Sequence, residues 1–262
     1  MRAVLTGEHP GLGGIRKAMK RIPSSPRCKL CAAPFQGLGG AVLKHFGYAR
    51  FAANPSLCQK CIVEFRQRGL TGTEIPVTLL FADVRGSTTL GEQMRPADFR
   101  AYLDRFYRIG SDAILGADGL VDKFVGDEVI GLFFGGFSGP GHAAAAIRAG
   151  RSLLGAAGRS DATPMGPIPV GAGIHTGEAY VGATGPKEAV DDFTALGDVV
   201  NTTARLASAA GAGELLVSLD ALAAAGEAPL DQETRTIDIR GREATLDVVV
   251  VHPARRTAAA RG

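Results

Sequence analysis

The sequence predicts an α+β fold, with helices on one face of a mainly antiparallel sheet and a small cysteine-containing unit in front of it. Three observations lead to this prediction. From residue 76 onward, strand-like and helix-like patterns follow the order strand–helix–strand–strand–helix–strand. All four cysteines lie within the first 61 residues. Residues 1–70 hold 12 lysines and arginines against 2 acidic residues, and the whole chain carries +3, so a basic front of +10 precedes an acidic body of −7.

Length and hydropathy bound the class of protein. A chain of 262 residues allows one or two domains. No stretch approaches ~18 uninterrupted apolar residues, and the start MRAVLTGEHPGLGG lacks the apolar core of a signal peptide, so we expect a cytoplasmic protein with no membrane span. The predicted divisions are a basic N-terminal segment (1–25), a four-cysteine unit with a connecting helix (26–70), a main domain (74–253) and a flexible tail (254–262).

The cysteines form two pairs, Cys28-Lys-Leu-Cys31 and Cys58-Gln-Lys-Cys61. Two CxxC knuckles can each present two sulfurs to one tetrahedral ion, so the spacing predicts a zinc-ribbon-like unit. A structural Zn²⁺ is favoured, and an iron–sulfur cluster is the alternative because it uses the same four thiolates. Disulfides are disfavoured in a cytosol. With four thiolates at hand, His45 is expected to be a surface histidine.

The rest of the front has little apolar content. AVLKHFGYARFAANPS, between the knuckles, has too few apolar residues to form a core alone, so a bound metal would supply much of the folding free energy of the unit. After Cys61, IVEFRQRG is typical of a short helix that ends at Gly69. The positive charge of the front is compatible with a solvated surface, or with contact to nucleic acid, anionic lipid or the acidic body.

The main domain begins with VTLLFADV (77–84), a nearly continuous apolar run that is typical of a central strand. STTLGEQM and PADFRAYLDRFYRIGSDAIL predict a helical region, with Pro96 near a helix start. A β-hairpin is predicted over residues 119–134, where apolar residues flank a Gly-Asp pair. The alanine-rich PGHAAAAIRAGRSLLGAA predicts the next helix.

The second half of the domain continues this alternation. PVGAGIHTG (169–177) is another apolar strand, and EAYVGATG continues from it. DVVNTTARLASAAG is predicted to be a helix that starts at Asp198 and is stopped by Gly211. ELLVS and the C-terminal TLDVVVV complete the predicted sheet.

Two aspartates stand out because of where they fall. Asp83 ends the first strand, and Asp127 lies in the hairpin turn. In a split βαβ core these strands are neighbours, so the two carboxylates would face each other and repel unless a divalent cation such as Mg²⁺ or Mn²⁺ lay between them. For either residue alone, a helix cap at Asp83 or a simple turn at Asp127 is the more ordinary interpretation.

A glycine-containing turn follows the first aspartate and opens a helix. Its residues are Arg85, Gly86, Ser87 and Thr88. The first backbone N–H groups of a helix have no partner within the helix, so they can surround a phosphate. The sequence therefore predicts a phosphate-binding turn beside the predicted cation site.

Three motifs together resemble one known family. FADVRGST, KFVGDEV and LGDVVNTTARL, in this order and spacing, are similar to the catalytic domain of class III nucleotidyl cyclases. The resemblance covers about residues 76–251, two-thirds of the chain, and three motifs in register are far more specific than any one of them. It implies a ferredoxin-like βαββαβ core, with the predicted zinc-ribbon-like unit added in front.

The resemblance implies a role for each motif residue. Two Mg²⁺ or Mn²⁺ ions per active site would be held by Asp83, the adjoining Val84 and Asp127. Asn201 would orient the ribose, and Arg205, four residues later on the same helix face, would neutralise charge in the transition state. The implied reaction is the attack of the ribose 3′-oxygen on the α-phosphorus of a nucleoside triphosphate, which expels pyrophosphate.

The base preference follows from two further positions that the resemblance implies. Lys123 would donate to a ring nitrogen of adenine, and Thr194 would accept from its exocyclic amine; guanine presents the reverse pattern, so the sequence favours ATP over GTP. A hydroxyl both donates and accepts, so discrimination at Thr194 is expected to be loose. Arg240 or Arg242 would contact the terminal phosphates or be a solvated charge. Glu128 is interpreted as a solvated turn residue in preference to an additional charge near the ions.

In the family, the metal-binding aspartates of one chain face the lysine, asparagine and arginine of another. This chain has both sets, so the resemblance implies a homodimer with two shared active sites and ATP as its substrate. Diguanylate cyclases and polymerase palms share the sheet topology, but they do not predict Lys123 or the Asn201–Arg205 helix. The alternative from another class is a catalytically weak domain that regulates or binds nucleic acid through its basic front; adenylate cyclase activity is the favoured prediction.

Overall fold

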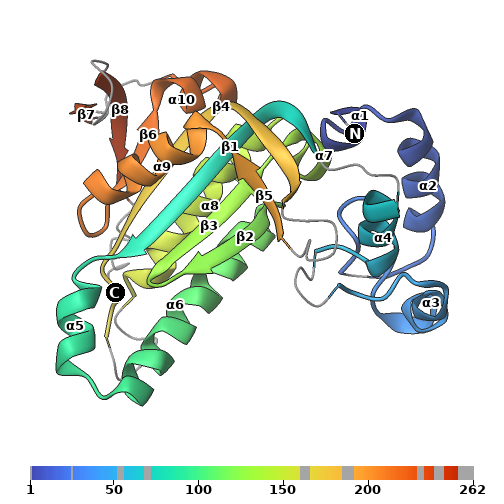
Figure 1. Ribbon diagram of the computed structural model, residues 1–262, viewed down its shortest axis with the longest axis horizontal. Coiled ribbons are helices and arrows are strands. Elements are labelled where there is room, and N and C mark those ends of the chain that lie inside the picture. The colour runs from blue at the N-terminus through green and yellow to red at the C-terminus, as the bar shows by residue number, and fades with distance from the viewer. Residues whose placement is uncertain are drawn as a thin grey trace, which may run out of the picture.

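The computed structural model describes residues 2–24, 26–51, 56–67, 72–159, 166–184, 192–228, 233–238 and 245–252. Figure 1 shows a central twisted sheet with helices packed on it and the N-terminal helices at one side. The described strands form one eight-stranded sheet in the order β2-β3-β1-β4-β6-β8-β7, with β5 paired to β4. The predicted α+β fold with its cyclase-like core is confirmed.

The strands of this sheet have the following bounds: β1 (Gly72–Val84), β2 (Leu120–Val125), β3 (Glu128–Phe133), β4 (Val170–Thr184), β5 (Asp192–Leu196), β6 (Leu215–Ser218), β7 (Glu233–Asp238) and β8 (Thr245–Val251). Every pair of neighbours is antiparallel except β4 and β6. The predicted hairpin corresponds to β2 and β3. The sequence did not predict β5 or β7; β7 is a largely exposed edge strand, so it lacks an apolar run.

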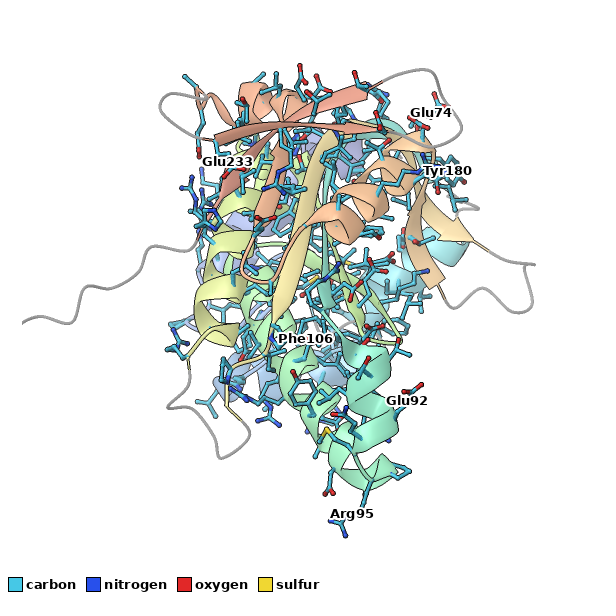
Figure 2. The ribbon with its side chains drawn as sticks, turned by 90° about the vertical axis from the view of Figure 1, so that its left-hand side faces the viewer. Glu74, Glu92, Arg95, Phe106, Tyr180 and Glu233 are labelled. Carbon is cyan, nitrogen blue, oxygen red and sulfur yellow. The ribbon has the colours of Figure 1, made fainter. Side chains whose placement is uncertain are left out.

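One face of the sheet is covered by α6 (Pro96–Gly116), α8 (His142–Ala157) and α10 (Leu219–Ala225). Alternate strand residues point to this face, so Leu80 and Ala82 are buried in the same cluster as Phe106 of α6. Figure 2 labels Phe106 beneath the sheet and Arg95 at the far end of the arm formed by α5 (Ser87–Gln93) and α6. Among the described residues, none of the helices combines the length and apolarity that a membrane span requires.

The second face of the sheet also carries a helix, so the prediction of helices on one face is wrong in this respect. Leu79 and Phe81 of β1 point to it and share a buried cluster with Val199 of α9 (Asp198–Ala209). The same cluster includes Leu5 and Leu30 from the N-terminal front. The short helix α7 (Gly135–Ser138) lies beside the front in Figure 1. The front therefore shares a core with the sheet, which explains how a segment with so few apolar residues is packed.

The front itself contains short helices: α1 (Arg2–Leu5), α2 (Pro10–Lys20), α3 (Gly37–Leu43), the 3₁₀ helix η1 (Lys44–Phe46) and α4 (Gln59–Gln67). The sequence predicted α4, but the helix begins at Gln59, directly after Cys58, and not after the second knuckle. The predicted end at Gly69 lies outside the described residues. The predicted basic segment is helical over much of its length, and the Arg2 guanidinium donates to the Glu74 carbonyl of β1.

Candidate functional site

The two predicted carboxylates come from one end of β1 and from the adjacent hairpin turn. β1 and β3 are antiparallel, and their register places Asp83 opposite Glu128. The N–H of Val84 donates to the carbonyl oxygen of Asp127 at 3.1 Å, which ties the turn to the end of β1. Gly126 precedes Asp127 with φ +61°, a value that favours glycine, so the tight turn depends on the Gly-Asp pair. The fold thus brings the predicted carboxylates together.

Burial and nearby negative charge raise the pKa of Asp83 and of Glu128. Burial and the nearby charge of Asp127 raise the pKa of Asp83 to about 6, although Arg85 opposes the shift. Burial and the charges of Asp83 and Asp127 raise the pKa of Glu128 to about 7. Glu128 is the half-buried first residue of β3, so its interpretation as a solvated turn residue is wrong. The strand register, which the local sequence does not reveal, places it opposite Asp83.

Three half-buried carboxylates at one place fit a hard divalent cation, because Mg²⁺ and Mn²⁺ prefer oxygen ligands and would relieve the repulsion. Arg85 offsets part of this charge. Arg85 Nη2 lies 2.8 Å from Asp83 Oδ2, and Arg85 Nη1 donates to the Ser208 carbonyl oxygen at 3.1 Å. The donor set therefore matches the predicted cation site.

The predicted phosphate-binding turn follows directly. Gly86 has φ +72° and precedes α5, and the side chain of Ser87 donates to the Asp127 carboxylate. The N–H of Arg85 donates to the Pro169 carbonyl oxygen at 2.7 Å, so it is not free to bind a phosphate. Of the four predicted residues, Gly86, Ser87 and Thr88 are left to supply backbone N–H groups.

Asn201 and Arg205 lie one turn apart on α9, which packs against β4. Asn201 is exposed. The Nη1 atom of Arg205 is buried, and it has no hydrogen-bond acceptor within the described part of the chain. A buried guanidinium nitrogen without a partner is unfavourable, so this atom is suited to an acceptor that comes from outside the described chain, such as a phosphate oxygen.

The two predicted base-reading residues lie on strands that are not neighbours in the sheet. Lys123 follows a register shift in β2, and Thr194 is a buried residue of β5. The Thr194 hydroxyl donates to Asp122 Oδ2 at 2.9 Å, which joins β5 to the residue beside Lys123. Asp122 was not singled out in the sequence, although it directly precedes Lys123 in VDKFVGD. Arg240 and Arg242 lie outside the described residues.

A second cluster of ligand-type side chains lies in the front. The Sγ atoms of the four cysteines lie within 4.8 Å of one another, and no disulfide joins them. Two of the separations are 3.9 Å (Cys28–Cys61) and 3.7 Å (Cys31–Cys58). A tetrahedral ion with Zn–S bonds of ~2.3 Å requires sulfurs about 3.8 Å apart. These two separations match one tetrahedral ion, and the other sulfurs lie within 4.8 Å.

The backbone holds each knuckle in place. In the first, the Ala32 N–H donates to the Cys28 carbonyl at 2.8 Å, and the Cys28 N–H donates to the Ala33 carbonyl at 2.9 Å. Ala32 has φ +61°, which a residue with a Cβ rarely adopts, so the surroundings must fix this turn. In the second, Cys58 lies directly before α4. His45 is exposed, as predicted for a surface histidine.

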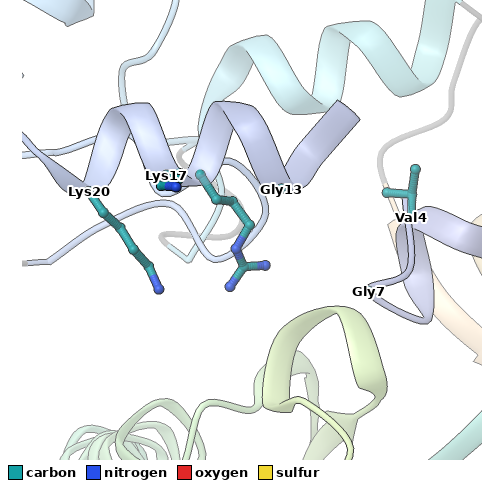
Figure 3. A pocket seen from close by; sticks show the side chains of 6 residues that line it. Val4, Gly7, Gly13, Lys17 and Lys20 are labelled. Atoms are coloured by element: carbon teal, nitrogen blue, oxygen red, sulfur yellow. The ribbon is translucent and has the colours of Figure 1, made fainter. Parts of the chain in front are cut away.

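The front also contains a basic hollow. A pocket of about 410 Å³ is lined by Val4, Gly7, Gly13, Arg16, Lys17 and Lys20 (Figure 3). Its charged lining residues are all cationic, and Arg16 also donates to the Gly136 carbonyl of α7 at 3.4 Å. The hollow gathers three of the positive charges of the front, but among the described residues that line it there is no aromatic side chain on which bases could stack.

Comparisons with known proteins agree with this geometry. The sequence profile of the adenylate and guanylate cyclase catalytic domain matches residues 72–251. An adenylate cyclase of Anabaena cylindrica is 32% identical over 138 residues, which are 50% of this chain and 26% of that protein. Adenylate cyclase 1 of Rhizobium meliloti (strain 1021) is 32% identical over 136 residues, 50% of this chain and 20% of that protein. The chain thus covers about a quarter or less of the length of these relatives.

Two solved structures share the fold. The guanylyl cyclase Cya2 is 27% identical with a TM-score of 0.64, and the similarity covers 72% of this chain and 98% of that one. The adenylyl cyclase CyaB from P. aeruginosa is 28% identical with a TM-score of 0.61, covering 71% and 97%. The chain is therefore similar in fold both to a cyclase named for GTP and to one named for ATP.

Proposed function

The chain belongs to the family of adenylate and guanylate cyclase catalytic domains, and on this basis we propose that it is an adenylate cyclase that converts ATP to 3′,5′-cyclic AMP and pyrophosphate. The observation that carries the proposal is the meeting of Asp83 and Asp127 at one end of the sheet, within the matched domain. Preference for ATP over GTP is supported by Lys123 and by the Thr194 hydroxyl, which lies against the neighbouring Asp122.

Each residue has a defined task in this reaction. Lys123 donates to a ring nitrogen of adenine, and Thr194 accepts from the exocyclic amine. Asn201 holds the ribose so that its 3′-oxygen is in line with the α-phosphorus. As that oxygen attacks, the bond from the α-phosphorus to the bridging oxygen breaks, and pyrophosphate leaves. Arg205 stabilises the charge that develops on the α-phosphate.

The carboxylate end of the sheet serves the same reaction. Asp83, the backbone at Val84 and Asp127 would hold two Mg²⁺ or Mn²⁺ ions, which supply charge neutralisation of the triphosphate and a lower pKa for the 3′-hydroxyl. Glu128 adds a third carboxylate at this place, with its pKa raised to about 7 by burial and by the two aspartates. The N–H groups of Gly86, Ser87 and Thr88 would bind phosphate oxygens beside these ions.

We also propose that two chains form a homodimer with two shared sites. The aspartates of one chain would then act with Lys123, Asn201 and Arg205 of the other. The buried Arg205 nitrogen, which has no acceptor among the described residues, supports this arrangement, because its acceptor would be a phosphate held in part by the partner chain. A monomer would accordingly be inactive.

The test is direct. The purified chain is given ATP and GTP separately, with Mn²⁺ and then Mg²⁺, and the cyclic nucleotide product is identified by mass spectrometry. Cyclic AMP in excess is the expected result. Predominant cyclic GMP would reverse the base preference, and no product from a well-folded dimer would contradict the proposed enzyme.

A second candidate function rests on the basic hollow in the front. In that case the chain would bind nucleic acid or another polyanion, and the cyclase-like domain would be catalytically weak. Absence of product in the assay, together with salt-dependent binding of single-stranded or duplex DNA, would favour it. This is the less favoured function, because none of the described residues lining the hollow is an aromatic on which a base could stack.

A further inference from the structure

We propose that the four cysteines bind one Zn²⁺ ion and that this site, outside the catalytic residues, fixes the edge strand β2 and with it Lys123. The sulfur positions carry the first part of the proposal. Their separations of 3.7 and 3.9 Å match a single tetrahedral ion. A polynuclear iron–sulfur cluster places metal and sulfide atoms between its cysteines, so it requires sulfurs farther apart than the 4.8 Å limit of this group.

The first knuckle is linked directly to the entry of β2. Lys29 lies between Cys28 and Cys31, and its ammonium group forms an ion pair with the carboxylate of Asp118. Asp118 lies in the turn between α6 and β2, two residues before Leu120, with φ +63°. Its carbonyl oxygen also accepts a hydrogen bond from the Ser138 hydroxyl at 3.0 Å. The position of the knuckle therefore bears on the conformation of the turn that leads into β2.

A shared apolar core is the second link. Leu30, inside the first knuckle, is 2% exposed, and Leu57, before the second knuckle, is 1% exposed. They belong to the same buried cluster as Leu120 of β2 and Ile130 and Leu132 of β3. β2 ends the strand order, so among the described strands it has a neighbour on one side only. Loss of the metal would loosen the front and remove part of the packing from this face of β2.

Metal analysis of the full chain tests the zinc site. Protein purified from zinc-supplemented medium is expected to contain one zinc per chain and no iron or sulfide. The double variant Cys28→Ser/Cys58→Ser is expected to lose the metal. The control His45→Ala removes an exposed histidine between the knuckles and is expected to keep the metal. Wild-type protein without zinc, or iron with sulfide in stoichiometric amounts, would overturn the assignment.

Hydrogen exchange tests the link to β2. Removal of the metal, by the double cysteine variant or by a thiol-modifying reagent on folded wild type, is expected to speed amide exchange in residues 120–125 about tenfold or more. Exchange in residues 245–251, at the other end of the sheet, is expected to stay unchanged. Metal-free protein with normal exchange in β2 would overturn the anchoring role.

A milder variant separates metal binding from anchoring. Asp118→Asn removes the charge that pairs with Lys29 but tolerates a positive φ. It is expected to keep one zinc and still to speed exchange at the start of β2, with a raised KM for ATP. Asp98→Asn, on the exposed first turn of α6, is the matched control and is expected to change neither. Unchanged amide exchange at the start of β2 in Asp118→Asn would show that the Lys29–Asp118 ion pair does not anchor this strand.

A different contact carries a second inference, which rests on the proposed cyclase activity: Asp122 sets the base preference by fixing the direction of the Thr194 hydroxyl. An ionised carboxylate can only accept, so at 2.9 Å the Thr194 proton points to Asp122 Oδ2. The hydroxyl oxygen then presents only lone pairs to a bound base. It can accept from the adenine amine, but it cannot donate to the guanine carbonyl. This removes the ambiguity that a hydroxyl would otherwise introduce.

The variant Asp122→Asn tests this role. Its amide can donate to Thr194, which frees the hydroxyl to donate to guanine, so the ratio of kcat/KM for ATP to that for GTP is expected to fall about tenfold. In a Thr194→Val background, the same change is expected to leave the ratio unaltered. An active enzyme whose ratio is unchanged in Asp122→Asn would overturn this inference alone, whereas no product from wild type would contradict the proposed function instead.

Discussion

The carboxylate site and the thiolate site are built on opposite principles. Asp83, Asp127 and Glu128 are half-buried and come from strand ends and a turn. Burial and neighbouring carboxylate charges raise the pKa of Asp83 and of Glu128. The four cysteines lie in a front that has little core of its own; three of them are buried, and their sulfurs fit one ion closely. The carboxylate site is open to ligands from outside the chain, and the thiolate site is closed.

This difference separates a working site from a structural one. Oxygen ligands with room for further ligands allow metal and substrate to exchange, which catalysis requires. Four thiolates complete a tetrahedron and leave no open position, which suits a site that holds a fold together. Both sites nevertheless belong to one sheet. The front that contains the cysteines packs against the second face of this sheet, and the carboxylates lie at one end of its strands.

The largest expected effect on activity comes from variants of the open carboxylate site and of Arg205. Asp83→Ala and Arg205→Ala are each expected to lose cyclase activity by about 10³-fold or more, because each removes charge stabilisation of several kcal/mol. In a shared-site dimer, mixing the two variants restores one intact site per mixed dimer. Recovery to about a quarter of wild-type activity is expected after subunit exchange, as measured by cyclic AMP formation.

The control for this pair is Arg95→Ala, an exposed arginine at the end of the α5–α6 arm, which is expected to keep full activity (Figure 2). Absence of recovery, with exchange of subunits demonstrated by mass spectrometry, would contradict the shared site.

Chelation is expected to distinguish the two centres. Brief treatment with EDTA is expected to abolish activity, which added Mg²⁺ or Mn²⁺ restores, because half-exposed oxygen ligands release their ions readily. The zinc content is expected to stay at one per chain under the same treatment, since the thiolates are largely buried. Metal content and activity are measured on the same samples. Loss of zinc in parallel with activity would show that the front is not the closed site described above.

A substitution in the front probes whether it shares a core with the sheet. Leu30→Ala is expected to lower the free energy of unfolding by about 2–4 kcal/mol, as large-to-small changes at buried leucines do. Because Leu30 lies in the same cluster as the strands, thermal unfolding of the variant is expected to remain a single transition. Leu38→Ala, at a leucine that is 90% exposed, is the matched control with little expected change. Separate transitions for the front and the sheet would contradict the shared core.

The smallest expected effect concerns Glu128 and pH. Its pKa in the fold, about 7, is above that of an unfolded glutamate, so its contribution to stability is full at low pH and is lost as pH rises through 7. Glu128→Gln removes this loss. Without divalent cations, the variant is expected to be about 1 kcal/mol more stable than wild type at pH 8, after allowance for solvent screening, and equal to it near pH 4.

Urea unfolding at the two pH values measures this difference. Glu92→Gln, at an exposed residue of α5, is the control and is expected to show no such pH dependence. An equal effect of Glu128→Gln at both pH values would show that ionisation of Glu128, which burial and the neighbouring carboxylates oppose, is not its cause.

Local sequence signals were enough to predict the alternation of strands and helices in the main domain and the two metal-ligand patterns. Apolar runs of strand length, a Gly-Asp turn and paired CxxC knuckles are local signals, because each depends on residues that are close in the chain. They predicted β1, the β2–β3 hairpin and α9, and they selected Asp83, Asp127 and the four cysteines. The sulfur cluster then formed within 4.8 Å, in agreement with the spacing.

Other features of the two sites depend on contacts between residues that are far apart in the chain. Glu128 lies opposite Asp83 only through strand register, and Asp122 accepts from Thr194 although 72 positions separate them. The edge strand β7 and the packing of the front on the sheet also had no local signal, since an exposed strand needs no apolar run and a shared core is not encoded in either partner alone. Contacts between distant residues therefore explain why the predicted ligands form one open carboxylate site and one closed thiolate site.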